Sequence, residues 1–227
     1  MFRTIAVTIG FAALATVAHA ADNQLSRAER KAGWILLFDG KTTEGWRGFK
    51  QAGADLGWQV EDGLLSPDPK AAKDLVTRAE FADFELTFDW RISPGGNSGV
   101  MFHVTEAGKR TYESGPEYQI LDNARGEPPL EQAGALYALY PPSRDATKPM
   151  GQFNRARLVV DRGKVQHWLN GVRVARYDMN SADFKARVTG SKFKAWPPFA
   201  ASPSGAIALQ NHGDAVAFRN VKIRPIR

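Results

Sequence analysis

The chain of 227 residues carries 30 lysines and arginines against 24 aspartates and glutamates, a formal net charge of +6, and it contains no cysteine. The basic residues are scattered along the chain, which argues against a nucleic-acid partner, because nucleic-acid binding needs a clustered basic stripe. Without cysteine the chain can form no disulfide and offers no thiol for lipid attachment, so the hydrophobic core alone must stabilise the fold.

The N-terminus has the pattern of a secretory signal peptide. Arg3 supplies a positive start, residues 5–17 form an apolar run, and Ala18-His19-Ala20 is a small-x-small cleavage site. The apolar run is shorter than the roughly 20 residues that a membrane-spanning helix needs. We therefore predict cleavage after Ala20, a periplasmic or secreted location, and no membrane partner.

Three segments follow from this reading: a signal peptide over residues 1–20, a polar N-terminal arm over 21–32 with a short helix, and one β domain over 33–227. Single all-β domains of roughly 200–250 residues are common. Many short strand-like runs, frequent turn signals and no long amphipathic helix predict a sandwich or barrel. The expected strands lie at residues 35–38, 58–60, 64–65, 75–77, 84–92, 98–104, 117–123, 157–160, 164–170, 172–178, 206–210 and 217–224.

Three of these strands alternate in a way that separates an apolar face from a polar face. They are the strands at residues 84–92, 98–104 and 117–123. Period-two alternation is typical of a strand with one face on the core and the other toward solvent or a ligand. If the three strands pair, their polar side chains share one sheet face and form a candidate site. The side chains that would meet there are Asp89, Arg91, His103, Glu117 and Gln119.

Two long irregular segments, residues 124–154 and 180–204, interrupt the strands. Loops of this length inside a compact domain are usually functional or ordered by their own side chains. We expect aromatic and basic residues from both segments to line the rim of a ligand groove. These are Tyr137, Lys192, Lys194 and Trp196.

Several segments between residues 33 and 224 resemble one enzyme family. In chain order they include LFDGKTTEGW, DFELTFDWRISPGGNSGVMF, GPEYQILDN, GALYALYPP, SKFKAWPPF and IALQNHGD. Together they resemble the 3-keto-disaccharide hydrolase family. The resemblance implies a concanavalin-like jelly-roll sandwich of two antiparallel sheets with long loops and a site on the concave sheet. It also implies a carbohydrate substrate, namely a glycoside already oxidised to a ketone at C3 of the sugar.

The chemistry of such a substrate favours elimination followed by hydration. A ketone at C3 acidifies the hydrogen on C2, so a base can remove it and form an enediolate. The leaving group then departs from C1, and water adds there. The site needs a base, an acid for the leaving group, and a group that stabilises the enediolate oxygen.

Three residues are the candidates for these roles. Glu117 is the first choice for a catalytic carboxylate, and His212, which follows a strand with small residues at Ala206 and Ala208, could be a base, an acid or a metal ligand. Arg91 suits the enediolate oxygen because a guanidinium presents several donors. A structural role is the alternative for each. The residues predicted to bind substrate are Asp89, Asn97, His103, Gln119, Tyr137, Lys192, Lys194, Trp196 and Gln210.

Two other functions remain open at this point. One is a non-catalytic carbohydrate-binding module on the same fold. The other is an ordinary glycosidase that pairs Glu117 with Asp89 or Glu113, with carboxyl groups about 5–5.5 Å or 6.5–9.5 Å apart. The oxygens of Asp122 and Asn123 would suit calcium, but the sequence has no calcium-loop or zinc motif. We therefore expect no required metal or other cofactor.

Overall fold

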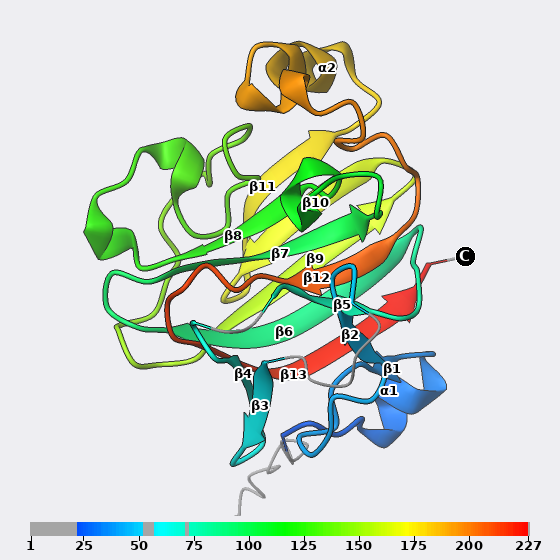
Figure 1. The fold of residues 1–227 in the computed structure, drawn as a ribbon, viewed down its shortest axis with the longest axis vertical. Coiled ribbons are helices and arrows are strands. Elements are labelled where there is room, and N and C mark those ends of the chain that lie inside the picture. Colours follow the sequence, from blue (N-terminus) through cyan, green and yellow to red (C-terminus); the bar gives the residue numbers. More distant parts are fainter. Residues whose placement is uncertain (1–21, 52–56, 71–72, 227) are drawn as a thin grey trace, which may run out of the picture.

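The computed structural model describes residues 22–51, 57–70 and 73–226. Within these residues two antiparallel sheets pack face to face, and the helices lie at the periphery (Figure 1). This arrangement confirms the predicted all-β jelly-roll sandwich. None of the helices in this part of the chain is long and apolar enough to cross a membrane. The predicted signal peptide, residues 1–20, lies outside the described residues.

The larger sheet has eight strands among the described residues, and β13 lies near its centre. The neighbours in space are β11 (Val172–Asp178), β10 (Lys164–Leu169), β9 (Asn154–Asp161), β6 (Phe84–Ile92), β13 (Val216–Pro225), β4 (Leu64–Pro67) and β3 (Trp58–Glu61), and β1 (Ile35–Leu36) also pairs with β13.

The smaller sheet has five strands in the same part of the chain. Their spatial order is β2 (Trp46–Gly48), β5 (Leu75–Thr77), β12 (Ala206–Leu209), β7 (Asn97–Val104) and β8 (Glu117–Leu121). Strand β2 was not expected from the sequence. The long strand β7 pairs with β12 on one side and β8 on the other, so it forms the middle of the face that carries the polar residues.

Short helices occupy the arm, the connection between β7 and β8, and the two long irregular segments. They are α1 (Arg27–Lys31), η1 (Thr111–Glu113), η2 (Asn123–Arg125), η3 (Pro129–Glu131), α2 (Ala182–Thr189) and η4 (Lys192–Ala195). The segment at 180–204 is thus more regular than expected. Helix α2 begins because the Ser181 hydroxyl accepts a hydrogen bond from the Phe184 backbone N–H, which caps an otherwise unpaired donor.

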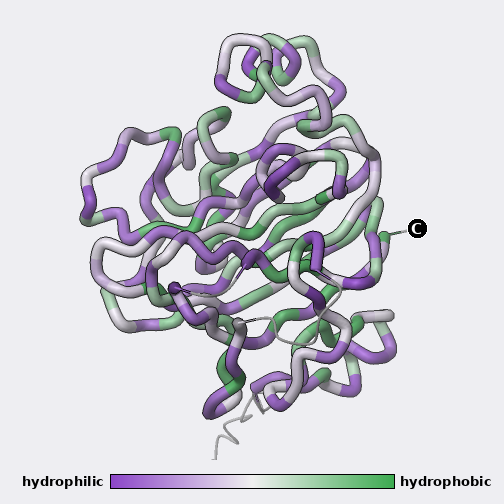
Figure 2. Tube along the Cα trace, in the orientation of Figure 1, coloured by the Kyte–Doolittle hydropathy of each residue, from purple (hydrophilic) through white to green (hydrophobic). Residues whose placement is uncertain are grey.

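The core lies between the two sheets and is rich in aromatic side chains. Phe84 on β6 meets Phe102 on β7 edge to face, with ring centroids 6.3 Å apart, and Phe88 meets Tyr118 on β8 at 5.5 Å. All four side chains are fully buried. Figure 2 shows the hydrophobic positions gathered along the central strands. Since each buried aromatic removes a large apolar area from water, these contacts hold the sheets together.

Of the three strands considered for pairing, residues 98–104 and 117–123 do pair, whereas residues 84–92 pair with neither of them. Strand β6 belongs to the eight-stranded sheet, whereas β7 and β8 belong to the five-stranded sheet. The connection between β6 and β7 passes from one sheet to the other through Pro94 and Gly95, and Gly95 takes a left-handed φ of 67°. Because both strands turn their apolar faces inward, their polar faces lie on opposite outer surfaces of the sandwich.

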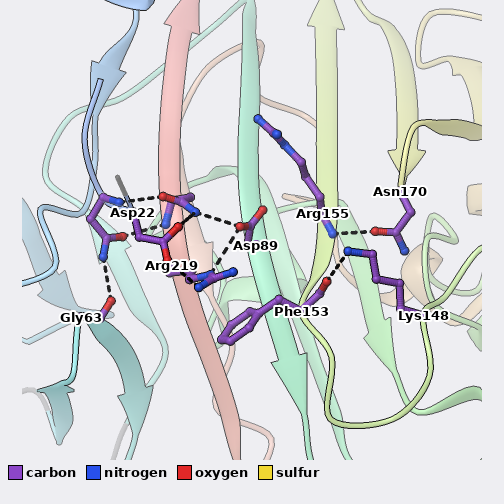
Figure 3. A network of polar contacts seen from close by, with 10 residues as sticks. Asp22, Gly63, Asp89, Lys148, Phe153, Arg155, Asn170 and Arg219 are labelled. Atoms are coloured by element: carbon purple, nitrogen blue, oxygen red, sulfur yellow. Dashed lines mark hydrogen bonds and ion pairs between the residues drawn. The ribbon is translucent and has the colours of Figure 1, made fainter. Parts of the chain in front are cut away.

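The N-terminal arm is tied to β13. The backbone N–H of Asn23 donates to Asn220 Oδ1 at 2.7 Å, and the Asn220 N–H donates to Asn23 Oδ1 at 2.8 Å. Asn23 Nδ2 also donates to the carbonyl of Gly63 in the turn between β3 and β4, at 2.8 Å (Figure 3). The arm therefore covers the larger sheet, on the side of the molecule away from β7 and β8.

Candidate functional site

A pocket of about 240 Å³ lies over the outer face of the five-stranded sheet. Strands β7 and β8 supply its floor, and the helical segments η1 and η4 and the turn after β12 supply its walls. The lining residues are Asn97, Tyr112, Glu117, Gln119, Tyr137, Lys192, Phe193, Trp196, Gln210 and His212. The structure thus brings together eight of the residues predicted to act in the site, six from the β7–β8 region and the irregular segments, and Gln210 and His212 from the turn after β12.

A larger hollow of about 410 Å³ lies at the ends of β6 and β8, but its carboxylates are already engaged. Asp122 accepts hydrogen bonds from the backbone N–H groups of Gly95 and Ala124, and Asp145 accepts from the backbone of Thr147. No histidine lines this hollow among the described residues. The smaller pocket, where acidic, basic and imidazole groups face one space, is therefore the better candidate for a catalytic site.

Strand register aims the polar residues of β7 and β8 into the pocket. Glu117 lies opposite Met101, and Gln119 lies opposite Gly99. Gln210 joins them because its backbone N–H donates to the Gly99 carbonyl at 2.9 Å, which extends the β12 side of the sheet. Since alternate residues share a face, one outer surface carries the carboxyl group and both amides.

Gly99 forms the floor beneath the carboxyl group of Glu117. A Cβ atom placed on Gly99 would lie 1.9 Å from Glu117 Oε1 and 2.7 Å from Glu117 Cδ. The glutamate side chain therefore lies across the β7 backbone at a point where only glycine leaves room. The carboxyl group thus occupies the space that a side chain at position 99 would fill.

Burial dominates the electrostatics of Glu117, whose exposed fraction is 7%. Loss of hydration raises the pKa of Glu117 to about 8, and the nearby Asp74 carboxyl group adds to the increase, while the Lys192 ammonium group opposes it. At neutral pH the carboxyl group is consequently protonated for most of the time. It can donate a proton at a pH where an ordinary glutamate cannot.

The raised pKa makes stability depend on pH. An unfolded glutamate ionises near pH 4.5, whereas folded Glu117 keeps its proton up to about pH 8. The contribution of protonated Glu117 to the free energy of unfolding is therefore complete below pH 4.5 and declines as the pH rises toward 8. We expect Glu117→Gln to be close to neutral at pH 4.5 and to increase the free energy of unfolding by about 3 kcal/mol at pH 7. Urea unfolding at the two pH values measures this difference.

The exposed Glu80 offers a matched control for that experiment. Glu80→Gln removes a carboxyl group that water already solvates, so it should change stability little at either pH. An equal effect of Glu117→Gln at both pH values would contradict the raised pKa.

Two buried acceptor atoms of the pocket have no hydrogen-bond donor among the described residues. Gln119 Nε2 donates to Asn97 Oδ1 at 3.2 Å, and Asn97 is itself held by a hydrogen bond from its backbone N–H to Asp214 Oδ2 at 3.0 Å. Gln119 Oε1 and Gln210 Oε1, however, have no hydrogen-bond partner there. Unpaired buried acceptors are costly, so donor groups of a ligand, such as sugar hydroxyls, would relieve them.

Aromatic and basic side chains form the wall opposite the sheet. Lys192 Nζ lies 4.3 Å from the centroid of the Tyr137 ring. The rings of Tyr112 and Trp196 are 5.4 Å apart, and Phe193 is buried beneath this segment. Aromatic faces of this kind suit the apolar face of a sugar ring.

Asp89 and Arg91 do not reach the pocket, which corrects the prediction for both. They lie on the outer face of the larger sheet because β6 belongs to that sheet. Asp89 Oδ2 accepts a hydrogen bond from Asn220 Nδ2 at 2.8 Å and lies 3.5 Å from Arg219 Nε (Figure 3). The guanidinium of Arg91 lies 4.8 Å from the Phe153 ring centroid. Both side chains therefore belong to a surface network.

His103 and Lys194 are also absent from the pocket lining. His103 adopts a left-handed φ of 54° beside an irregularity in the β7–β12 pairing, and its Nε2 atom lies 2.7 Å from the Ala82 carbonyl. Its burial lowers its pKa, so it is a neutral structural residue. Lys194 lies two residues after Lys192 on η4 and is exposed.

Three residues that shape the pocket were not predicted from the sequence. Tyr112 and Phe193 line the pocket, and Gly99 clears its floor. Tyr112 follows no periodic pattern, because it lies in a short 3-10 helix within a loop. The close approach that Gly99 permits is visible only when β7 and β8 are paired.

Metal binding receives no geometric support from the residues that the structure describes. Among them, no group of three or more histidine, aspartate or glutamate side chains gathers as a metal site. Both oxygens of Asp122 accept backbone hydrogen bonds, and Asn123 Oδ1 accepts one from Ala133 at 2.9 Å. The oxygens considered for calcium thus already hold the local backbone.

The profile of one protein family, described as a 3-keto-alpha-glucoside-1,2-lyase-like domain, matches residues 33–224. The match includes every residue of the pocket lining. The chain belongs to this family.

Relatives support membership of the 3-keto-alpha-glucoside-1,2-lyase-like family. A 3-keto-disaccharide hydrolase of Bacteroides thetaiotaomicron is 31% identical over 226 aligned residues, which cover 85% of this chain and 78% of that protein. A crystal structure of a Parabacteroides distasonis protein assigned as a glycosyl hydrolase is 36% identical, with a TM-score of 0.84 over 91% of this chain and all of that one. A second structure from the same organism, with the same assignment, is 27% identical at a TM-score of 0.70 and covers 85% of this chain and 99% of that one. The member described here is a glycoside-hydrolase-like enzyme, as predicted.

Proposed function

We propose that the enzyme hydrolyses glycosides that carry a ketone at C3 of the sugar, by removal of the C2 proton, elimination and hydration. The observation that carries the proposal is a buried carboxyl group, Glu117, with a pKa of about 8 in the same pocket as a histidine and a lysine. This elimination needs an unprotonated base and a protonated acid in one site at the same pH. The name of the Bacteroides relative points to the same substrate class.

The groups in the pocket suggest one assignment of roles. His212 removes the proton from C2, and the electron pair moves toward the C3 oxygen to form an enediolate. The Lys192 ammonium group, which already influences Glu117, takes the stabilising role first assigned to Arg91. As the enediolate collapses, the bond between C1 and the leaving oxygen breaks, and Glu117 gives that oxygen its proton.

Hydration completes the reaction. The ionised Glu117 accepts a proton from water as the water oxygen attacks C1, and C2 regains a proton from His212. The sum is cleavage of one glycosidic bond by one water molecule, with both side chains returned to their first states. Gln119 and Gln210 supply acceptors for sugar hydroxyls, and Trp196 supplies an apolar face. The signal-peptide pattern at residues 1–20 supports action outside the cytoplasm.

A comparison of substrates tests this function. Purified protein is given a 3-keto-glucoside and its unoxidised parent, and we expect release of the leaving group from the keto form alone. Cleavage of both would favour a two-carboxylate glycosidase, although neither Asp89 nor Glu113 lines the pocket. Binding without turnover would favour a carbohydrate-binding module.

Deuterium incorporation distinguishes elimination from direct displacement. In D₂O the product of elimination and hydration should carry one deuterium at C2, because the base returns a solvent-exchanged proton. Mass spectrometry measures the mass increase after the product is reduced at its carbonyl groups, which stops later exchange beside the ketone. A product without deuterium at C2 would contradict the proposed mechanism.

A further inference from the structure

A half-buried carboxyl group behind the pocket, Asp74, contacts two of the segments that carry pocket residues. Asp74 directly precedes β5. One of its oxygens accepts a hydrogen bond from the Thr111 hydroxyl, and the other accepts from the backbone N–H of Asn211 at 3.0 Å. Thr111 precedes Tyr112, and Asn211 precedes His212. One side chain therefore bonds to the residue that precedes each of these pocket residues.

Charged groups on neighbouring segments act on Asp74. His212 follows β12 and Arg110 precedes η1, and both favour ionised Asp74, although its burial raises its pKa. The charge of Asp74 raises the pKa of Glu117 on β8, and the charge of Lys192 on η4 lowers it. Because the charge of Asp74 opposes ionisation of Glu117, the two carboxyl groups lose their protons one after the other, and one of them keeps its proton to the higher pH.

Hydrogen bonding decides which carboxyl group keeps that proton. The backbone N–H of Asn211 can only donate, and the Thr111 hydroxyl donates as well, so both contacts favour the ionised form of Asp74. Glu117 instead lies across the Gly99 backbone in a pocket with two unpaired amide oxygens. These surroundings favour a neutral carboxyl group that can itself donate.

We propose that Asp74 is a positioning residue of the active site, which holds Tyr112 and His212 in place and whose negative charge keeps the proton on Glu117. The use that the enzyme makes of this proton rests on the proposed function. The distribution of the proton between the two carboxyl groups is a property of the free protein and can be measured without substrate.

A carbon-13 NMR titration of the side-chain carboxyl groups tests the proposal. The protein is labelled at the glutamate δ carbons, and the Glu117 signal is identified by its loss in Glu117→Gln. Asp74→Asn removes the charge but keeps the size and one acceptor. We expect the Glu117 midpoint to fall by about one pH unit or more in Asp74→Asn. An unchanged midpoint would overturn the proposal.

Asp214→Asn is the matched control. Asp214 also accepts a backbone hydrogen bond beside the pocket, from Asn97 at 3.0 Å, but it does not contribute to the pKa shift of Glu117. Its replacement should leave the Glu117 midpoint in place. A decrease equal to that in Asp74→Asn would mean that any nearby carboxylate has this effect, which contradicts a specific role for Asp74.

A second titration works even if Asp74→Asn does not fold. The aspartate γ carbons are labelled, and the Asp74 signal is assigned through its own backbone resonances. If Asp74 ionises while Glu117 is still protonated, Glu117→Gln leaves the Asp74 midpoint unchanged, because glutamine resembles neutral glutamate. A lower Asp74 midpoint in this variant means that Glu117 ionises first, and it overturns the proposal.

Activity measurements separate this proposal from the proposed function. In Asp74→Asn the alkaline limb of the kcat/KM profile should move to lower pH by the same amount as the Glu117 midpoint, whereas a purely structural defect would lower kcat/KM equally at every pH. If the NMR shift occurs but no 3-keto-glycoside is cleaved, the proposed function fails and the role of Asp74 stands. If a 3-keto-glycoside is cleaved but the Glu117 midpoint does not shift in Asp74→Asn, the proposed function stands and the role of Asp74 fails.

Discussion

Glu117→Gln is expected to lower kcat on a 3-keto-disaccharide by about 10²–10⁴-fold, the usual contribution of a positioned general acid. Glutamine fills the same volume over Gly99 but has no acidic proton. Because the fold should gain rather than lose stability at neutral pH, the loss cannot come from unfolding. Initial rates at saturating substrate, with a circular dichroism spectrum of the variant, measure the effect.

The leaving group makes this test specific for an acid role. A nitrophenolate departs without a proton, so a nitrophenyl 3-keto-glucoside should lose far less activity in Glu117→Gln than a disaccharide does. Equal losses on both substrates would exclude Glu117 as the proton donor. Arg91→Ala, on the outer face of the other sheet, serves as the control and should leave kcat on both substrates unchanged.

Gly99→Ala is expected to lower kcat by about 10²-fold, because a displacement of roughly 1 Å in a catalytic group has effects of this size. The new Cβ would lie 1.9 Å from Glu117 Oε1, a distance that forces the carboxyl group to move. Gly99 is not among the residues with a left-handed backbone, so alanine adds no backbone strain there. The carboxyl group of Glu117 is the flexible part, and it should give way.

A double-mutant cycle shows whether Gly99→Ala acts through Glu117. If it does, Gly99→Ala combined with Glu117→Gln should be little worse than Glu117→Gln alone, since two changes to one catalytic group are not additive. Losses that multiply would mean that the methyl group disturbs another part of the pocket. Steady-state kinetics of the four proteins gives the comparison.

Local pattern was a reliable guide to individual strands. The alternation over residues 84–92 and 98–104 placed both strands and their buried faces, since a strand with one face in the core needs apolar side chains at every second position. The same alternation turned Glu117 and Gln119 to the outer face of β8. The turn at His212 and the segment around Lys192 were recognised as parts of a site, and the structure brings them to one pocket.

The pattern could not tell which strands are neighbours. The alternation is the same whether two consecutive strands pair or lie in different sheets. After β6 the chain crosses to the other sheet, so β6 and β7 do not pair. This single difference moved Asp89 and Arg91 to the opposite surface of the molecule. Only the tertiary structure places Lys192, the group proposed to stabilise the enediolate, near Glu117.

By itself, the sequence determined the family, the all-β sandwich and the presence of an outward carboxyl group at Glu117, because these depend on motifs and on local alternation. Only the tertiary structure decided how that carboxyl group behaves. Its pKa depends on burial and on Asp74, 43 positions earlier in the chain, and its position depends on a glycine in the neighbouring strand. Desolvation and close packing arise between segments that meet only in the folded chain, so no local pattern records them.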